Sequence, residues 1–125
     1  MGNYTILVLD DDPGARTLLE IMLSRTGFTV KLANDADEAL EVLRQMLPDL
    51  VISDISLPGM DGIEFVTELR QHELTANLPV IILSAHHDEP TINKALRAGA
   101  TEFMKKPLKM DGLREKLIQL IENKD

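Results

Sequence analysis

Short apolar runs rich in β-branched residues alternate with longer segments of helical period along the chain, and this alternation constrains the fold more than any other feature. The runs lie at residues 5–9, 28–33, 50–53, 80–84 and 101–104. Several of them are continuously apolar, as expected for strands that are buried on both faces. Alternation of this kind predicts a parallel β-sheet covered by helices.

The segments between the runs carry start, stop and periodicity signals of helices. Asp12 followed by Pro13 predicts an N-cap with proline at the first helical position, and Gly27 predicts the end of that helix. Asp35 and Glu38 predict a carboxylate version of the capping box at the start of a second helix. Apolar residues at helical spacing predict three further helices, through Ile63, Val66 and Leu69, through Ile92, Ala95 and Leu96, and through Leu113, Leu117, Leu120 and Ile121.

Five strands and five helices use the full length of 125 residues, so we expect a single domain over residues 1–125. Right-handed crossovers favour an α/β fold with a doubly wound, five-stranded parallel sheet. The pattern leaves two arrangements open, one Rossmann-like and one in the flavodoxin-like order 2-1-3-4-5. In both of them the functional cleft lies at the carboxyl ends of the strands.

Composition and charge exclude several classes of function. The chain has 21 acidic and 13 basic side chains and a formal net charge of −8, which argues against direct binding of nucleic acid or anionic lipid. The absence of cysteine excludes disulfides, thiolate metal sites and cysteine nucleophiles, and it fits a reducing compartment. No apolar run approaches the ~20 residues of a membrane span, and no leader precedes the first strand, so we expect a cytoplasmic protein.

Residues with reactive side chains follow the strands that would be central in the sheet. Asp10 and Asp11 follow the first apolar run, Asp54 follows the third, Ser84 ends the fourth, and Lys106 lies just beyond the fifth. Because the carboxyl ends of parallel strands meet at one edge, we expect these carboxylates, the hydroxyl and the ammonium group to share one pocket.

Three carboxylates in one pocket would repel one another unless a cation offset their charge. A hard divalent cation is the simplest remedy, and carboxylates with a backbone carbonyl are what Mg²⁺ prefers. The charges of Asp10, Asp11, Asp54, Mg²⁺ and Lys106 then sum to zero. A site balanced in this way can receive a phosphoryl group through in-line attack by a carboxylate.

Four segments of the chain resemble the signature regions of response-regulator receiver domains, the CheY-like family. They are ILVLDDDPGAR (6–16), PDLVISDISLPGMDG (48–62), VIILSAHHD (80–88) and AGATEFMKKPL (98–108). The resemblance covers the entire chain, with the motifs in the order of the family. It implies the flavodoxin-like strand order 2-1-3-4-5 and a single receiver domain, with no effector domain in this chain.

The resemblance also implies a role for each acidic residue of the pocket. Asp54 matches the phosphoacceptor, which becomes an aspartyl phosphate. Asp10 and Asp11 match the acidic pair that holds Mg²⁺, with Mn²⁺ as an alternative, together with Asp54 and the backbone carbonyl of Ser56. Ser56 and His86 occupy positions at which the family tunes the lifetime of the phosphorylated state.

Four further residues match the machinery that senses the phosphoryl group. Lys106 matches the lysine that pairs with it, and Pro107 matches the cis-proline that follows this lysine. Ser84 matches the switch residue whose hydroxyl moves to a phosphoryl oxygen. Phe103 occupies the position of the aromatic residue that rotates inward on activation.

The implied function is that of a phosphorylation-controlled switch. A sensor histidine kinase or phosphotransfer protein donates the phosphoryl group, and the face of the fourth and fifth helices signals a downstream effector protein or domain. Self-phosphorylation and autodephosphorylation are the only reactions expected, so the protein is not an enzyme with a substrate of its own. We expect a monomer or a phosphorylation-dependent dimer.

Structural interpretations compete with several of these roles. Asp12 is interpreted mainly as a helix cap rather than a third metal ligand. Ser84 alone is compatible with a strand-end hydroxyl bonded to the backbone, and Phe103 with a core residue. Lys105 is a second lysine at the same strand end, and only the lysine–proline step and the family register favour Lys106.

Two other classes of function share some of these sequence features. A Mg²⁺-dependent phosphatase or phosphotransferase of haloacid-dehalogenase type also uses an aspartyl nucleophile, but it requires an Asp-x-Asp-x-Thr run, and the segment DDDPG (10–14) lacks the threonine. A flavodoxin-like cofactor-binding protein requires a loop that cradles phosphate, whereas aspartates after the first strand would repel one.

Overall fold

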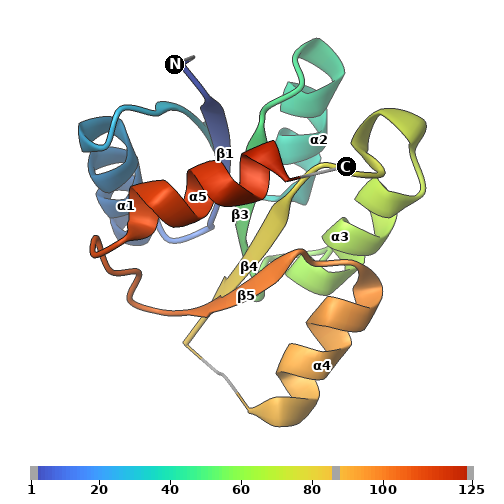
Figure 1. Cartoon of the computed structure of the whole chain (residues 1–125). Helices are drawn as coiled ribbons and strands as arrows, with labels where there is room; N and C mark the ends of the chain where they lie inside the picture. Colours follow the sequence, from blue (N-terminus) through green and yellow to red (C-terminus); the bar gives the residue numbers. More distant parts are fainter. Residues whose placement is uncertain (1–2, 86–87, 124–125) are drawn as a thin grey trace.

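The computed structural model describes residues 3–85 and 88–123 and contains one five-stranded parallel sheet with helices on both faces (Figure 1). The strand order is β2-β1-β3-β4-β5, which confirms the flavodoxin-like order and excludes the Rossmann-like alternative. The elements are β1 (Thr5–Leu9), α1 (Pro13–Arg25), β2 (Thr29–Ala33), α2 (Ala36–Gln45), β3 (Leu50–Asp54), α3 (Gly62–Arg70), a 3₁₀ turn η1 (Glu73–Thr75), β4 (Val80–Ser84), α4 (Glu89–Ala98), β5 (Glu102–Lys105) and α5 (Leu113–Glu122). None of the helices within these residues combines the length and the apolar character needed to cross a membrane.

The strands agree with the predicted runs to within one residue at each end. β1 and β4 have the predicted bounds, and β3 extends by one residue to include Asp54. β2 begins at Thr29 rather than at Phe28, because the N–H of Phe28 donates to the carbonyl of Leu23 at the end of α1 (3.1 Å) and not to a neighbouring strand. β5 lies one residue later than predicted and pairs Ser84 with Lys105.

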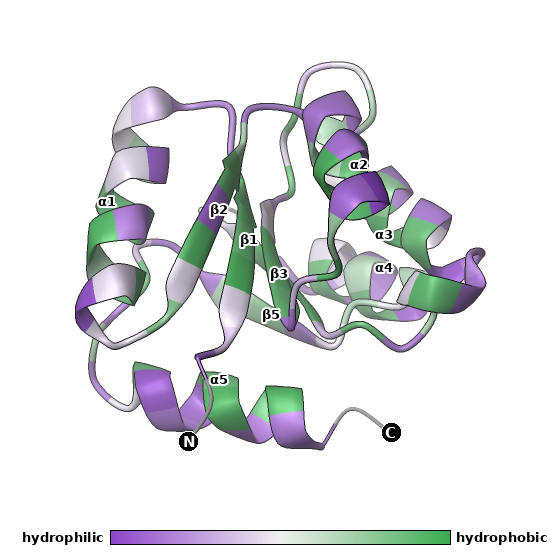
Figure 2. Ribbon diagram, turned by 90° about the horizontal axis from the view of Figure 1, so that it is seen from above, coloured by the Kyte–Doolittle hydropathy of each residue, from purple (hydrophilic) through white to green (hydrophobic). Residues whose placement is uncertain are grey.

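Two apolar clusters cover the two faces of the sheet, because successive side chains of a strand point to opposite faces. Ile6, Val8, Leu50 and Ile52 pack with residues of α1 and α5, including Leu23 and Leu117. Leu7, Leu9, Val51 and Ile82 pack with residues of α2, α3 and α4, including Ala39, Phe65 and Ala95. The same division is visible in Figure 2, where α1 and α5 lie on one side of the strands and α2, α3 and α4 on the other. Burial on both faces explains why the strands are continuous apolar runs.

The predicted start and end of α1 are confirmed. The side chain of Asp12 accepts a hydrogen bond from the N–H of Ala15 (3.1 Å), and Pro13 is the first helical residue. The helix ends before Gly27, whose positive φ of 99° suits a residue without a Cβ.

The predicted capping box at α2 is only half correct. The Asp35 side chain accepts from the N–H of Glu38 (2.8 Å), but the Glu38 carboxylate accepts from the N–H of Asn34 instead of that of Asp35. The reciprocal box lies at α3, between Asp61 and Glu64. The two cap residues differ in their φ angle, which is −151° at Asp35 and −77° at Asp61. Because φ sets the direction of the backbone N–H, only the N–H of Asp61 points toward the glutamate three residues later.

Candidate functional site

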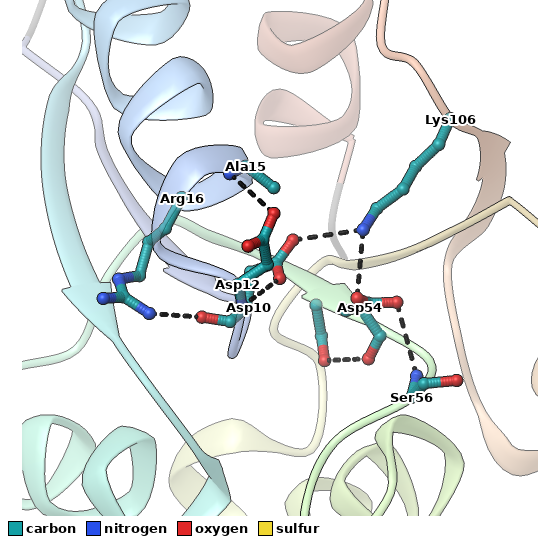
Figure 3. A network of polar contacts seen from close by, with 8 residues as sticks. Asp10, Asp12, Ala15, Arg16, Asp54, Ser56 and Lys106 are labelled. Atoms are coloured by element: carbon teal, nitrogen blue, oxygen red, sulfur yellow. Dashed lines mark hydrogen bonds and ion pairs between the residues drawn. The ribbon is translucent and has the colours of Figure 1, made fainter.

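The carboxyl ends of β1, β3 and β5 bring Asp10, Asp54 and Lys106 together at one edge of the sheet (Figure 3). The ammonium nitrogen Nζ of Lys106 lies 3.0 Å from Oδ2 of Asp54 and 3.2 Å from Oδ2 of Asp10. These residues are 52 and 96 positions away from Lys106 in the sequence. The parallel sheet therefore makes one ion cluster from three distant segments.

Asp10 is buried, with 1% of its surface exposed. Its Oδ1 atom accepts from the N–H of Asp12 (3.0 Å), and its Oδ2 atom accepts from Lys106. The backbone N–H of Asp10 donates to the carbonyl of Ala33 on β2 (3.2 Å). These contacts provide the hydrogen bonds that a buried carboxylate requires.

Asp54 is the last residue of β3, and its side chain is 13% exposed, more than that of Asp10. Its Oδ1 atom accepts from the N–H of Ser56 (3.3 Å). The backbone behind it is closely packed, since a Cβ at Gly62 would lie 2.4 Å from the carbonyl oxygen of Asp54. Glycine at position 62 therefore allows α3 to begin directly against the end of β3.

The charge of Lys106 is set by opposing effects. Burial by itself lowers the pKa of the Lys106 ammonium group, but the hydrogen bonds and negative charges of Asp54 and Asp10 outweigh burial and raise the pKa above its ordinary value. Lys106 is therefore a permanent cation at neutral pH and partly offsets the charge of the two carboxylates.

Carboxylate oxygens of Asp10, Asp11 and Asp54 all lie within 4.8 Å of one another. This set of hard oxygen donors fits a divalent cation such as Mg²⁺, which binds through one or two carboxylates and keeps several waters. Asp11 is exposed and Asp54 is half-buried, so the cluster is open to solvent on one side. Asp12 caps α1, which agrees with its interpretation as a cap.

The remaining predicted residues lie around this cluster. Ser84 is buried at the end of β4, and its backbone carbonyl accepts from the N–H of Lys106 (2.9 Å). Phe103 is partly buried and packs against the cluster under α2, α3 and α4. The peptide bond between Lys106 and Pro107 is cis, the isomer that the resemblance implies. His86 lies outside the described residues.

The structure separates the two adjacent lysines. Lys105 is exposed at the end of β5, whereas the side chain of Lys106 is 26% exposed and contacts Asp10 and Asp54. Successive side chains of an extended chain point in opposite directions. Because Lys106 directly follows the last residue of β5, its side chain points toward the cluster while that of Lys105 points to solvent.

No pattern in the sequence predicts a role for Arg16, Asn34 or Gly62. Arg16 lies in the motif of residues 6–16, but no local pattern shows that its side chain reaches the backbone of Asp10. Gly62 follows Asp61, and Asp61 with Glu64 forms an Asp-x-x-Glu pattern that is typical of a capping box. This pattern could have located the start of α3 at Gly62.

Comparison with known proteins agrees with this fold. A family model described as response regulator receiver domain matches residues 6–118. A 14.6 kDa protein of Leptolyngbya boryana is 41% identical over 108 residues, which are 86% of this chain and 82% of that protein. The transcriptional regulatory protein AfsQ1 of Streptomyces coelicolor is 36% identical over 104 residues, which are 83% of this chain and 45% of that protein. The matched part of the chain therefore spans less than half the length of that regulator.

Solved structures share the fold over nearly the full chain. The receiver domain of sensor histidine kinase PA1611 from Pseudomonas aeruginosa, solved with a magnesium ion coordinated in its active-site cleft, has a TM-score of 0.88 and 29% identity. The alignment covers 98% of this chain and 100% of that one. The chemotaxis protein CheY4 of Vibrio cholerae has a TM-score of 0.88 and 27% identity, with coverage of 95% and 99%.

These relatives give no support to a phosphatase of haloacid-dehalogenase type. The matched family model covers most of the chain, and the strand order is that of the CheY-like fold. The chain belongs to the response regulator receiver domain family of two-component signal transduction.

Proposed function

We propose that Asp54 is the phosphoacceptor, which receives a phosphoryl group from the phosphohistidine of a sensor histidine kinase or phosphotransfer protein. The observation that carries the proposal is that Asp54 combines a partly exposed carboxylate with a direct contact to Lys106. Asp10 shares the lysine contact but is buried, so an incoming phosphoryl donor reaches Asp54 more readily.

The transfer is a displacement at phosphorus. An electron pair of an Asp54 carboxylate oxygen forms the new O–P bond while the P–N bond to the donor imidazole breaks, and its electron pair stays on the imidazole nitrogen. Lys106 donates to the transferred group, which adds about one negative charge to the cluster. Water later cleaves the acyl phosphate and restores the carboxylate. We expect these two reactions on Asp54 and no turnover of a separate phosphomonoester substrate.

Asp10, Asp11, Asp54 and the backbone carbonyl of Ser56 would hold Mg²⁺, with Mn²⁺ as an alternative. When bound, the divalent cation supplies charge compensation for the carboxylates and the phosphoryl oxygens. Ser56 lies two residues after Asp54, and His86 lies two residues after Ser84. We propose that these two residues set the lifetime of the phosphorylated state.

Ser84 and Phe103 form the proposed switch. Ser84 is buried at the end of β4, next in the sheet to β3 with its Asp54, and its hydroxyl would move to a phosphoryl oxygen. Phe103 lies on β5, where Ile82 of β4 is its register partner, and its ring would rotate inward when Ser84 moves. The face formed by α4 and α5 then signals to an effector protein or domain. We expect the protein to act in the cytoplasm as a monomer or as a phosphorylation-dependent dimer.

An apolar groove beside Lys106 supports the proposal that the phosphoryl donor is a protein. Leu18 of α1, which is 55% exposed, lines it together with Pro107 and Leu108. We expect Leu18→Asp to slow phosphorylation by a kinase or phosphotransfer protein that modifies the wild type, while phosphorylation by acetyl phosphate keeps its rate. Equal slowing with both donors would show that the groove does not serve the protein donor.

The central experiment treats the protein with beryllofluoride and Mg²⁺ and follows the backbone amide signals of residues 84–106. We expect large shifts in the wild type and none in Asp54→Asn. Asp35→Asn is the matched control, because it makes the same chemical change at a helix cap where asparagine is equally suitable. This variant should respond as the wild type does.

Mass spectrometry after acetyl phosphate treatment provides the second measurement. One phosphoryl group should appear on the wild type and on Asp35→Asn but not on Asp54→Asn. A response of Asp54→Asn identical to that of the wild type would overturn the assignment. Turnover of an added phosphomonoester beyond one equivalent would contradict the absence of an independent substrate.

A further inference from the structure

Arg16 connects the backbone of Asp10 to the loop after β2. Its Nη1 atom donates to the carbonyl oxygen of Asp10 (2.8 Å) and to Oδ1 of Asn34 (3.1 Å). The contact to Asp10 is drawn in Figure 3, where the Arg16 side chain extends from α1 to the end of β1. Arg16 is half-buried and lies in the first turn of α1.

This contact completes the hydrogen bonding of Asp10. The backbone N–H of Asp10 donates to Ala33, its carboxylate oxygens accept from Asp12 and Lys106, and its carbonyl accepts from Arg16. Because Asp10 is 1% exposed, water cannot readily replace a lost partner at its carbonyl. The orientation of the Asp10 peptide therefore depends on Arg16.

The second partner, Asn34, is itself fixed. Its backbone N–H donates to the Glu38 carboxylate in the first turn of α2, and Asp35 caps the same helix. Arg16 thus joins the acidic loop after β1 to the start of α2 through Asn34. A guanidinium group suits this task, because it stays charged and presents several N–H donors in a fixed plane.

We propose that Arg16 is a positioning residue of the phosphoacceptor site, which holds the Asp10 peptide so that the Asp10 and Asp11 carboxylates face Asp54 in a geometry that binds a divalent cation. This inference rests on the proposed function of that site. Arg16 acts through the backbone of Asp10 and does not touch the cation or the phosphoryl group.

Removing Arg16 changes the Mg²⁺ affinity in opposite directions, depending on whether the residue acts by positioning the loop or only by its charge. Arg16 is a cation near three aspartates, so its charge alone opposes the binding of Mg²⁺, and its removal would tighten binding. If Arg16 positions the acidic loop, its removal weakens binding despite the lost repulsion. Partners outside the ligand set typically contribute 10- to 100-fold to metal affinity, and we expect about a tenfold loss here.

The experiment compares Arg16→Met with Arg44→Met in the full chain. Arg44 lies on α2 and forms an exposed ion pair with Glu41, so Arg44→Met removes the same charge and side chain away from the site. An NMR titration with MgCl₂, following the amides of residues 10–12 and 54–56, gives the dissociation constant. The amide signals of Asp12 and Asn34 in the metal-free proteins provide a readout independent of the cation.

We expect Arg16→Met to bind Mg²⁺ about tenfold more weakly, with shifted Asp12 and Asn34 amides before any cation is added. Arg44→Met should match the wild type. Arg16→Lys should recover part of the affinity, because an ammonium group also donates several hydrogen bonds. Unchanged or tighter binding by Arg16→Met would overturn the positioning role.

A second variant decides the question if Arg16→Met does not fold. Asn34→Ala removes one of the two acceptors and leaves Arg16 in place, and we expect a roughly two- to tenfold loss of affinity, the equivalent of one net hydrogen bond. Affinity equal to that of the wild type would then overturn the inference. If the wild type itself neither binds Mg²⁺ nor responds to beryllofluoride, the proposed function fails instead.

Discussion

The Lys106 ammonium group contacts the carboxylate of Asp54 at 3.0 Å, although the two residues are 52 positions apart. The contact exists because β3 and β5 both end at the same edge of a parallel sheet, on either side of β4. In the unphosphorylated protein, Lys106 is thereby held beside the carboxylate to which we propose that a phosphoryl group is added. The same contact makes the stability of the domain sensitive to changes in the site.

Replacing Lys106 by methionine should destabilise the metal-free protein at neutral pH. The change leaves the buried Asp10 carboxylate without its cation, and we expect the free energy of unfolding to fall by about 1–3 kcal/mol, the usual cost of an unpaired buried polar group. Urea denaturation in the presence of EDTA measures this loss.

Lys105→Met is the matched control, since Lys105 is the exposed neighbour at the end of β5. We expect it to change the free energy of unfolding by less than about 0.5 kcal/mol, as for most surface substitutions. Equal losses in the two variants would contradict a specific role of the Lys106 contacts.

The contribution of Lys106 should disappear at alkaline pH. Its pKa is raised in the folded protein, so the folded state binds the proton more tightly than the unfolded chain. The stabilisation is therefore fully present below the ordinary pKa of 10.5 and is lost as pH rises through the folded pKa. The difference in unfolding free energy between wild type and Lys106→Met should shrink in this range.

Tyr4 titrates in the same alkaline range, so the comparison needs a suitable background. The pKa of Tyr4 is raised, chiefly because its hydroxyl donates a hydrogen bond to Glu122. Both proteins should therefore carry Tyr4→Phe. A difference that stays constant up to the highest pH at which the proteins fold would show that the Lys106 pKa is not raised.

Mg²⁺ should stabilise the wild type against unfolding, because the folded cluster binds it and the unfolded chain does not. At a concentration 100 times the dissociation constant, the expected gain is about 2.7 kcal/mol. Asp11→Asn should lose most of this gain, since it removes one carboxylate of the cluster without touching the Lys106 contacts.

Asp12→Asn tests whether replacing any aspartate of the loop after β1 would abolish the stabilisation by Mg²⁺. Asp12 caps α1 through its side chain, and asparagine caps helices equally well. Asp12→Asn should therefore keep the Mg²⁺-dependent stabilisation, as measured by thermal unfolding with and without MgCl₂. A loss as large as that of Asp11→Asn would place Asp12 in the cation site.

Gly62→Ala should distort the site through the backbone. Its Cβ would lie 2.4 Å from the carbonyl oxygen of Asp54 and 2.9 Å from Cα of Ile55, so the end of β3 or the start of α3 must shift. We expect a loss of about 1–3 kcal/mol in the free energy of unfolding, as for other overpacked positions. The amide signals of residues 54–56 should shift as well.

Gly14→Ala provides the comparison, because the nearest atom to its Cβ would be Oδ2 of Asp12 at 3.8 Å, an ordinary contact. Gly14 lies in α1, where alanine is the better helix former, so this variant should be neutral or stabilised by up to about 1 kcal/mol. A comparable loss in both variants would contradict the steric explanation for Gly62.

Local patterns predicted the elements well, because they depend on near neighbours in the chain. Apolar runs located the strands to within a residue, and the Asp12–Pro13 step located the start of α1. The capping box was assigned to Asp35 and Glu38, although the complete box lies at Asp61 and Glu64. The sequence pattern is the same at both places, and the backbone φ of the cap residue, which the pattern does not encode, makes the difference.

Local patterns in the sequence predicted that five buried strands alternate with helices and that Asp10, Asp11, Asp54 and Lys106 follow strand ends. This prediction was possible because hydrophobic periodicity and capping chemistry depend only on residues close together in the chain. Local patterns left open the strand order and the choice between Lys105 and Lys106. The resemblance to receiver domains implied both, and the tertiary structure shows the order β2-β1-β3-β4-β5 and the contacts of Lys106 with Asp10 and Asp54. The contact of Arg16 with the Asp10 carbonyl is visible only in the tertiary structure. These features depend on which backbone groups and charges meet across the sheet edge, and that meeting is set by packing between segments far apart in the chain.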